Sequence, residues 1–249
     1  MDKNILVLEY QNNFADNFSN LAYAKLLESK YPLKSCFENQ TIKRSQFEKL
    51  MNNFKFDCSF ISSSRVNDIS KKTRYMDLRD FRYNKRNQNS IISIPYFKIS
   101  DADLITNETK KMFDFKNFDF IKNYDILEEI KTTNSIGIYV SSYDNIDNEY
   151  VLASYERLNK YLKKPILYIF TSKDVQLNSG INYKIFNLSD WREEFYFLRC
   201  CRHKIIHCTN SSYSEGFWAS ILGNSNNFNY VVYNKNLKQK EKFNNWIAV

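Results

Sequence analysis

The sequence predicts an α/β fold in which two Rossmann-like halves face each other across a cleft. Short apolar runs of strand length recur along the chain, for example at 4–9 and 166–170. Continuous runs of this kind are typical of strands buried on both faces of a parallel sheet. Longer stretches with apolar residues at helical spacing lie between them. This alternation indicates an α/β class, and two such halves would bind a ligand at the carboxyl ends of their strands.

The first half is predicted to span residues 1–133. Its strands are expected at 4–9, 33–37, 56–61 and 91–97. Its helices are expected at 17–30, 45–53 and 118–131, because apolar residues recur there at helical spacing. Residues 62–90 are polar, basic and without periodicity, so we expect an irregular insertion.

The second half is predicted to span residues 134–249. Its strands are expected at 135–140, 166–170, 183–186, 204–207 and 230–233. Its helices are expected at 148–162, 191–202 and 211–222, followed by a helical tail through Trp246. In the first of these helices Val151, Tyr155 and Leu158 share one face, which should pack on the sheet.

Charge and composition narrow the classes of partner. The chain has 249 residues and a formal net charge of +8, which suits an acidic nucleotide or a peripheral contact with an anionic membrane. No recognition motif accompanies the basic clusters at 71–86 and 238–242, so nucleic acid is not an expected partner. The five cysteines lack metal-ligand spacing, which argues against a metal site and favours reduced thiols. No signal peptide or spanning segment is evident, so we expect a cytoplasmic protein.

One segment is much more specific than the rest. Residues 194–206 read Glu-Phe-Tyr-Phe-Leu-Arg-Cys-Cys-Arg-His-Lys-Ile-Ile, and Asn210-Ser-Ser-Tyr-Ser214 and Trp218 follow. This pattern resembles the signature of glycosyltransferase family 11, the bacterial α-1,2-fucosyltransferases, with Cys201 and His203 on its Cys and His. Shorter matches at 15–22, 95–97 and 168–172 occur in the same order along the chain.

The resemblance implies a GT-B-like enzyme without a metal or other cofactor. A member of this family would transfer fucose from GDP-fucose to a glycan hydroxyl, with the acceptor on the first half and the nucleotide sugar on the second. The resemblance places a group of residues at the donor: Tyr139, Ser141, Ser142, His203, Asn210, Ser211, Ser212 and Ser214. A turn that opens a helix with free N–H groups and hydroxyls suits an anion, although Asn and Ser are also common helix caps.

The chain departs from the family at its His-x-Arg-Arg-x-Asp motif. Here the segment reads Tyr139-Val-Ser-Ser-Tyr-Asp144, so serines replace both arginines. Serine cannot reproduce the bidentate, charged contacts that arginine makes with phosphate. Three explanations remain open: a catalytically inactive relative, a lid formed by residues 71–86, or phosphate contacts moved to other cations. Those cations are Arg65, Arg157, Lys160, Lys173, Arg199 and Arg202.

Two aspartates are the catalytic candidates, because an acceptor hydroxyl must lose a proton as it attacks. Asp16 lies on the predicted loop after the first strand, and Asp144 follows the first strand of the second half. Asp16 would serve equally well as a helix cap. Glu194 is expected in the first turn of a helix, where the dipole favours a carboxylate, and His207 is expected to be packed within a strand.

These residues predict a transferase that builds surface polysaccharide or oligosaccharide on a glycan or lipid-linked acceptor. The alternative is a catalytically inactive protein of the same fold that binds a sugar or a partner.

Overall fold

The computed structural model divides the chain into two compact units, Met1–Asn117 and Phe118–Val249. The structure describes residues 4–8, 18, 21, 24–25, 28, 33–39, 52–55, 59–62, 64, 76–77, 92–93, 107–141, 145–177, 180–207, 215–223, 229–234 and 246–249. The break falls before Phe118, whereas the sequence analysis places it near residue 133. The two units are described separately below.

The first unit contains a small parallel sheet. Strands β1 (Asn4–Leu8), β2 (Leu33–Asn39) and β3 (Ser59–Ser62) pair in the order β1-β2-β3. Strands β4 (Met76–Asp77) and β5 (Ile92–Ser93) form a second parallel pair, and helix α4 spans Asn107–Met112. Buried aromatic rings pack in the core. The centroid of the Phe18 ring lies 5.0 Å from that of Phe54 and 4.8 Å from that of Phe113. Of the predicted helix at 45–53, residues 45–51 lie outside the described residues, and residues 52–53 form a turn.

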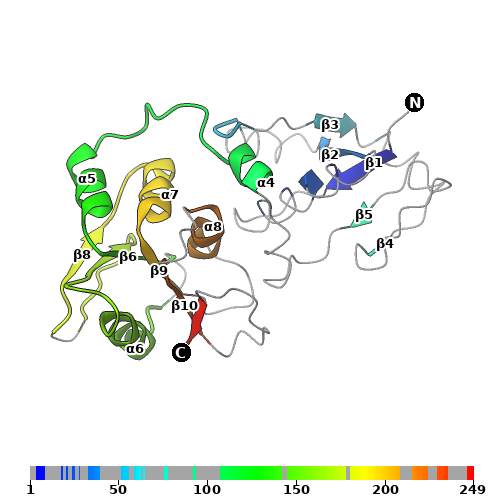
Figure 1. Cartoon of the computed structure of the whole chain (residues 1–249). Coiled ribbons are helices and arrows are strands. Elements are labelled where there is room, and N and C mark those ends of the chain that lie inside the picture. The colour runs from blue at the N-terminus through cyan, green and yellow to red at the C-terminus, as the bar shows by residue number, and fades with distance from the viewer. Residues whose placement is uncertain are drawn as a thin grey trace. The chain divides into compact units, whose positions relative to one another are not determined.

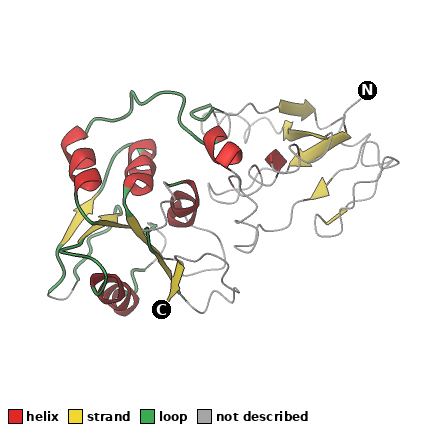
Figure 2. Ribbon diagram, viewed as in Figure 1, coloured by secondary structure: helices red, strands yellow, loops and turns green. Residues whose placement is uncertain are grey.

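The second unit is built on a parallel sheet of six strands (Figures 1 and 2). The strands are β6 (Ser135–Tyr139), β7 (Ile166–Phe170), β8 (Tyr183–Phe186), β9 (His203–Ile206), β10 (Val231–Tyr233) and β11 (Trp246–Ala248). The helices are α5 (Tyr124–Thr132), α6 (Asn148–Asn159), α7 (Trp191–Cys200) and α8 (Glu215–Leu222). The spatial order is β11-β10-β9-β6-β7-β8. Numbered from the first strand of the unit, this is the 3-2-1-4-5-6 order of a Rossmann sheet.

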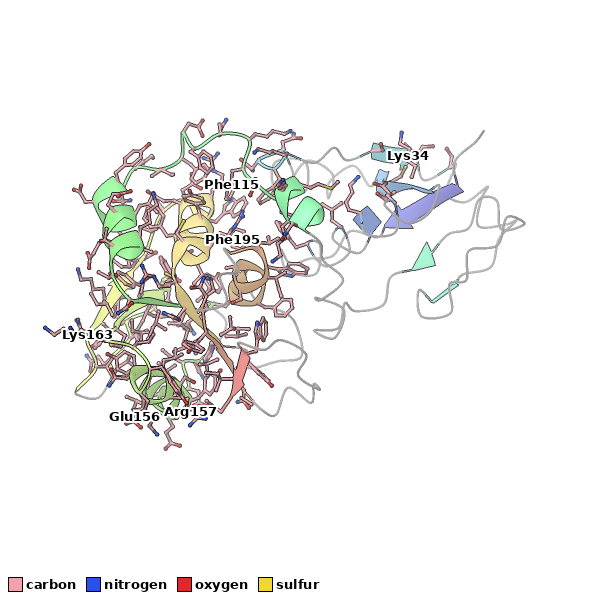
Figure 3. The ribbon with its side chains drawn as sticks, in the orientation of Figure 1. Lys34, Phe115, Glu156, Arg157, Lys163 and Phe195 are labelled. Atoms are coloured by element: carbon pink, nitrogen blue, oxygen red, sulfur yellow. The ribbon has the colours of Figure 1, made fainter. Side chains whose placement is uncertain are left out.

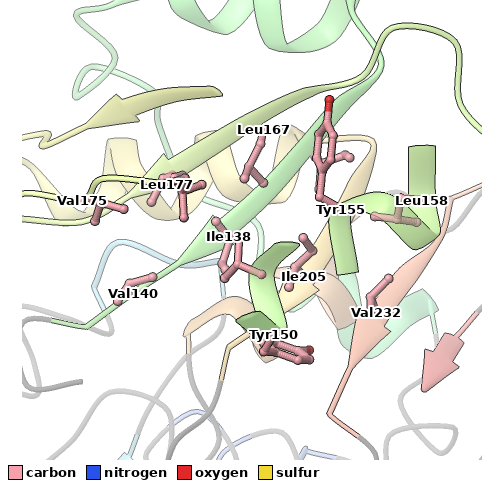
Figure 4. Close-up of a cluster of buried hydrophobic side chains, with 13 residues drawn as sticks. Ile138, Val140, Tyr150, Tyr155, Leu158, Leu167, Val175, Leu177, Ile205 and Val232 are labelled. Carbon is pink, nitrogen blue, oxygen red and sulfur yellow. The ribbon is translucent and has the colours of Figure 1, made fainter. Parts of the chain in front are cut away.

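Helix α6 covers one face of this sheet. Its buried residues Val151, Tyr155 and Leu158 pack with Ile138 of β6 and Ile205 of β9 in an apolar cluster (Figure 4). The predicted apolar face of this helix is therefore confirmed. Burial of one such aliphatic side chain contributes about 1.5–3 kcal/mol, so this layer is a large part of the core of the unit.

Helices α5, α7 and α8 lie on the other face of the sheet (Figure 1). Gly137 of β6 allows α7 to approach closely, since a Cβ at this position would lie 2.8 Å from the Sγ of Cys201 and 2.9 Å from the Cδ1 of Leu198. Residues alternate between the two faces of a strand. Because Gly137 faces α7, Tyr139 lies on the same side, whereas Ile138 faces α6.

A buried carboxylate explains why α5 belongs to the second unit. Glu193 of α7 is 2% exposed, and its Oε1 accepts hydrogen bonds of 2.7 Å from the backbone N–H groups of Lys122 and Asn123. Its Oε2 accepts a third bond from the Asn123 side chain. The helix therefore begins at Tyr124 rather than at residue 118, and its first turn is attached to α7.

The predicted helical tail lies outside the described residues over 235–245, and at Trp246, the last residue assigned to it, the prediction is wrong. Trp246 begins β11, which pairs in parallel with β10 through Val232 and Ile247. A three-residue edge strand is too short to show a period in the sequence, and its partner strand rather than local propensity determines its conformation.

Candidate functional site

The strand order of the second unit places a topological switch point between β6 and β9. From β6 the chain proceeds outward to β7 and β8, then returns to β9 and proceeds outward in the opposite direction to β10 and β11. Strands β6 and β9 are direct neighbours, with Ile138 paired to Ile205. In open parallel sheets, ligands bind at the carboxyl ends of the strands on either side of such a point. The candidate site is therefore the end of β6 near Tyr139 and the end of β9 near His207.

Two of the predicted donor residues lie at this edge. Tyr139 is the last residue of β6 and is half-buried on the α7 side of the sheet. Ser141 follows two positions later and is also half-buried. Most of the other predicted site residues lie outside the described residues: Asp16, Ser142, Asp144, Asn210, Ser211, Ser212 and Ser214. In the chain, Ser142 and Asp144 follow β6, and Asn210 to Ser214 follow β9.

His207 has a definite role at the same edge. It directly follows β9, and its Nε2 accepts a 3.1 Å hydrogen bond from the backbone N–H of Asp147. Asp147 is the N-cap of α6 and accepts from the N–H of Tyr150. The Tyr150 hydroxyl in turn donates to the carbonyl of Ile206. These bonds attach the start of α6 to the end of β9, which fixes the backbone on the α6 side of the site.

His203 lies at the amino ends of the strands, opposite to the carboxyl ends where Tyr139 and His207 lie. It is the first residue of β9 and pairs with Ile136, near the start of β6. Its Nδ1 accepts from the backbone N–H of Tyr230, and its ring stacks on the Tyr230 ring at 5.6 Å. The structure therefore does not bring His203 together with Tyr139 and Ser141, and its predicted contact with a donor remains a prediction.

His203 should make the protein sensitive to acid. Burial and the nearby charges of Lys204 and Arg202 lower its pKa from 6.5 to about 4. The unfolded chain therefore binds a proton that the folded chain does not, so stability is full above pH 6.5 and falls as the pH drops toward 4. We expect protonation of His203 to lower the free energy of unfolding by about 2–3 kcal/mol between pH 7.5 and pH 4.5. Urea unfolding at pH 7.5 and pH 4.5 measures it.

The matched variant for this test is His203→Gln, whose amide oxygen can still accept from Tyr230 but does not titrate. Its stability should change less between the two pH values than that of the wild type. An equal change in both proteins would show that His203 is not the titrating group.

The cations proposed as substitutes for the missing arginines are not all at the site edge. Arg157 and Lys160 lie at the end of α6, and Arg199 and Arg202 lie at the end of α7. Helices that connect parallel strands end at the amino edge of the sheet, away from the ligand side. Lys173, three residues after β7, is at the carboxyl edge. Arg65 lies outside the described residues.

The carboxyl edge of the sheet also holds a pair of carboxylates that are not among the site residues predicted from the sequence. Glu194 lies in the first turn of α7 and Glu215 begins α8. Burial and the charge of Glu215 raise the pKa of Glu194 to about 7. The two carboxylates lie 21 positions apart in the sequence, and only the packing of α7 against α8 brings them together.

Among the described residues, no three His, Cys, Asp or Glu side chains gather in a way that would hold a metal ion. None of the helices in the described part of the chain has the length and apolarity needed to cross a bilayer.

The fold is similar to that of one solved structure, and a second solved structure aligns more weakly. An Arg-to-Lys mutant of FUT1 from Arabidopsis thaliana, solved in complex with GDP, aligns with a TM-score of 0.50 and 10% identity, over 93% of this chain and 70% of that one. TibC, an iron-containing dodecameric glycosyltransferase from enterotoxigenic E. coli, aligns with a TM-score of 0.36 and 10% identity, over 94% of this chain and 58% of that one. No protein-family model and no curated protein sequence matches the chain. The α/β, GT-B-like fold class predicted from the sequence is confirmed.

Proposed function

We propose that this chain is a glycosyltransferase that moves a sugar from a nucleotide-sugar donor to a glycan hydroxyl. The donor is GDP-linked, and the sugar is fucose or a relative. The acceptor is a growing surface polysaccharide or oligosaccharide, free or lipid-linked. The protein works in the cytoplasm, where its basic charge favours peripheral contact with the anionic inner face of the membrane.

One observation carries this proposal. Asn210–Ser214, which resembles a fucosyltransferase motif, follows β9 in the chain. Tyr139–Asp144, which stands where that family has its His-x-Arg-Arg-x-Asp motif, begins at the last residue of β6. These are the two strands at the switch point of a Rossmann-like sheet, where nucleotides bind. The motifs are a property of the sequence and the strand order is a property of the fold, so the two support the proposal separately. The complex of FUT1 with GDP, whose fold is similar, supports a guanine nucleotide as the first candidate.

The proposed donor site uses backbone and hydroxyl contacts in place of the arginine pair. Ser141, Ser142 and Asn210 to Ser214 would donate to the phosphates, and Lys173 at the end of β7 supplies a cation at the same edge. Asp16 and Asp144 remain catalytic candidates because of their predicted positions after the first strand of each half.

A calorimetric titration with GDP, UDP and CMP and their common sugar conjugates tests the proposal. We expect saturable binding of one nucleotide, with GDP preferred. Asn210→Ala and Ser212→Ala should each weaken binding by about tenfold, because one hydrogen bond to a charged phosphate contributes roughly 1.5 kcal/mol or more. Ser189→Ala is the matched control, since Ser189 is exposed and precedes α7 beyond the outermost strand β8. Failure of every nucleotide to bind at millimolar concentration would refute the proposal.

A second candidate is a binding protein of the same fold that has lost catalysis. The serines at 141 and 142, in place of arginines, favour it, because loss of two charged phosphate contacts costs transition-state stabilisation. Nucleotide or sugar binding without any sugar transfer or donor hydrolysis would select this candidate.

A further inference from the structure

We propose that Glu194 is the general base that accepts the proton of the acceptor hydroxyl during sugar transfer. This inference rests on the proposed function and adds a residue that the resemblance does not place in the chemistry. It follows from the position of Glu194 over the switch point, from its partners and from its neighbours.

The helix phase directs Glu194 toward the sheet. Glu194, Leu198 and Cys201 follow the i, i+4, i+7 spacing that aligns residues on one side of a helix. Leu198 and Cys201 are the residues that crowd the space above Gly137 of β6. Glu194 therefore shares the sheet-facing stripe of α7. Phe195, its neighbour in the chain, is labelled in Figure 3 on this helix.

The strand register then places Glu194 above the end of β6. Helix α7 runs antiparallel to the strands, and four helical residues from Leu198 back to Glu194 span about 6 Å. Two strand residues from Gly137 to Tyr139 span about 6.6 Å in the same direction. Glu194 is thus level with Tyr139, the last residue of β6, which lies on the same side of the sheet. Tyr139 is the residue after Ile138, and Ile138 pairs with Ile205 of β9. Strand β9 therefore lies beside the end of β6.

The carboxyl group of Glu194 is available for chemistry. It is half-buried, and no hydrogen bond or ion pair holds it among the residues that the structure describes. By contrast, its neighbour Glu193 is fully engaged at the start of α5, and Asp190 is paired with Arg192 at 2.6 Å. A carboxylate that served only to cap or anchor a helix would have such partners.

Burial and the charged groups on the surrounding elements explain the affinity of the Glu194 carboxylate for protons. Burial raises the pKa of Glu194, and the like charge of Glu215 on α8 raises it further, to about 7. Lys204 of β9 lies toward the other end of α7, where its Nζ donates to the carbonyl of Cys201. On α5, Glu129 is paired with Lys184 of β8. A base with a pKa near the working pH is the most effective one for proton transfer.

The reaction step balances as a single displacement. The acceptor oxygen forms a bond to the anomeric carbon of the donor sugar as the bond from that carbon to the phosphate oxygen breaks. The nucleoside diphosphate leaves with the bonding electron pair, and the hydroxyl proton passes to the ionised Glu194. Removal of this base should lower turnover by a factor of 100 or more.

Steady-state rates of nucleotide-sugar consumption between pH 5 and pH 9 test the inference, together with calorimetric binding of GDP. Glu194→Gln should lower kcat at least 100-fold while the Kd for GDP changes less than twofold. The wild-type kcat should rise through an apparent pKa near 7, and Glu215→Gln should move this rise to lower pH because a like charge is removed. Glu156→Gln, on the exposed side of α6, is the control (Figure 3).

The outcomes separate the inference from the proposed function. If GDP and the other nucleotides do not bind the wild type, both fail. If nucleotide binds but the wild type shows no turnover, the inactive binding protein replaces the transferase and the inference fails with it. If the wild type turns over and Glu194→Gln turns over at the same rate, only the inference fails. An acid limb that Glu215→Gln does not move also overturns it. Thermal unfolding of each glutamine variant establishes that the loss does not come from misfolding.

Discussion

Replacement of Glu193 by alanine is expected to lower the free energy of unfolding of the second unit by about 2–4 kcal/mol. Glu193 is 2% exposed, and its carboxylate accepts three hydrogen bonds at the start of α5. Without it, the N–H groups of Lys122 and Asn123 lose a charged acceptor, and α5 loses its attachment to α7. Urea unfolding followed by circular dichroism measures the change.

Two further variants make this test specific. Glu193→Gln keeps one acceptor oxygen and should cost less than the alanine variant. Glu128→Ala removes an exposed carboxylate of α5 that pairs with Lys131, and such surface pairs contribute at most about 1 kcal/mol. If Glu193→Ala and Glu128→Ala have similar effects, Glu193 does not anchor the helix.

The elements of the second unit are largely readable from the sequence. The strands at 166–170 and 183–186 are predicted with the bounds that the structure has, because each is a short apolar or alternating run between clear breaks. Helix α6 is predicted from the spacing of its buried face. The start of α5 is not predicted, because a carboxylate on α7, far along the chain, sets it.

The site is only partly readable. The sequence indicates that Tyr139 and the segment at 210–214 each follow a strand, but the adjacency of β6 and β9 depends on the order of all six strands. His203 could have been placed from the sequence, since a residue between a helix and the next strand lies at the amino edge of a parallel sheet. The pairing of Glu194 with Glu215 could not, because it requires α7 to pack on α8.

Replacement of Gly137 by alanine is expected to destabilise the second unit by about 1–3 kcal/mol, because the added methyl group has no space. A Cβ at position 137 would lie 2.8 Å from the Sγ and 2.9 Å from the Cβ of Cys201, and 2.9 Å from the Cδ1 of Leu198. The backbone of β6 is held on both sides by β7 and β9, so α7 must move instead. Thermal and urea unfolding measure the loss.

A double-mutant cycle identifies the cause. Cys201→Ala removes the sulfur nearest to the new methyl group, so the double variant Gly137→Ala/Cys201→Ala should be more stable than the sum of the two single losses predicts. Additive losses would mean that the alanine acts through the strand and not through its contact with α7. Because Glu194 is on the same helix face as Cys201, a shift of α7 should also expose its carboxyl group and lower its pKa, which a side-chain NMR titration of Gly137→Ala against the wild type would detect.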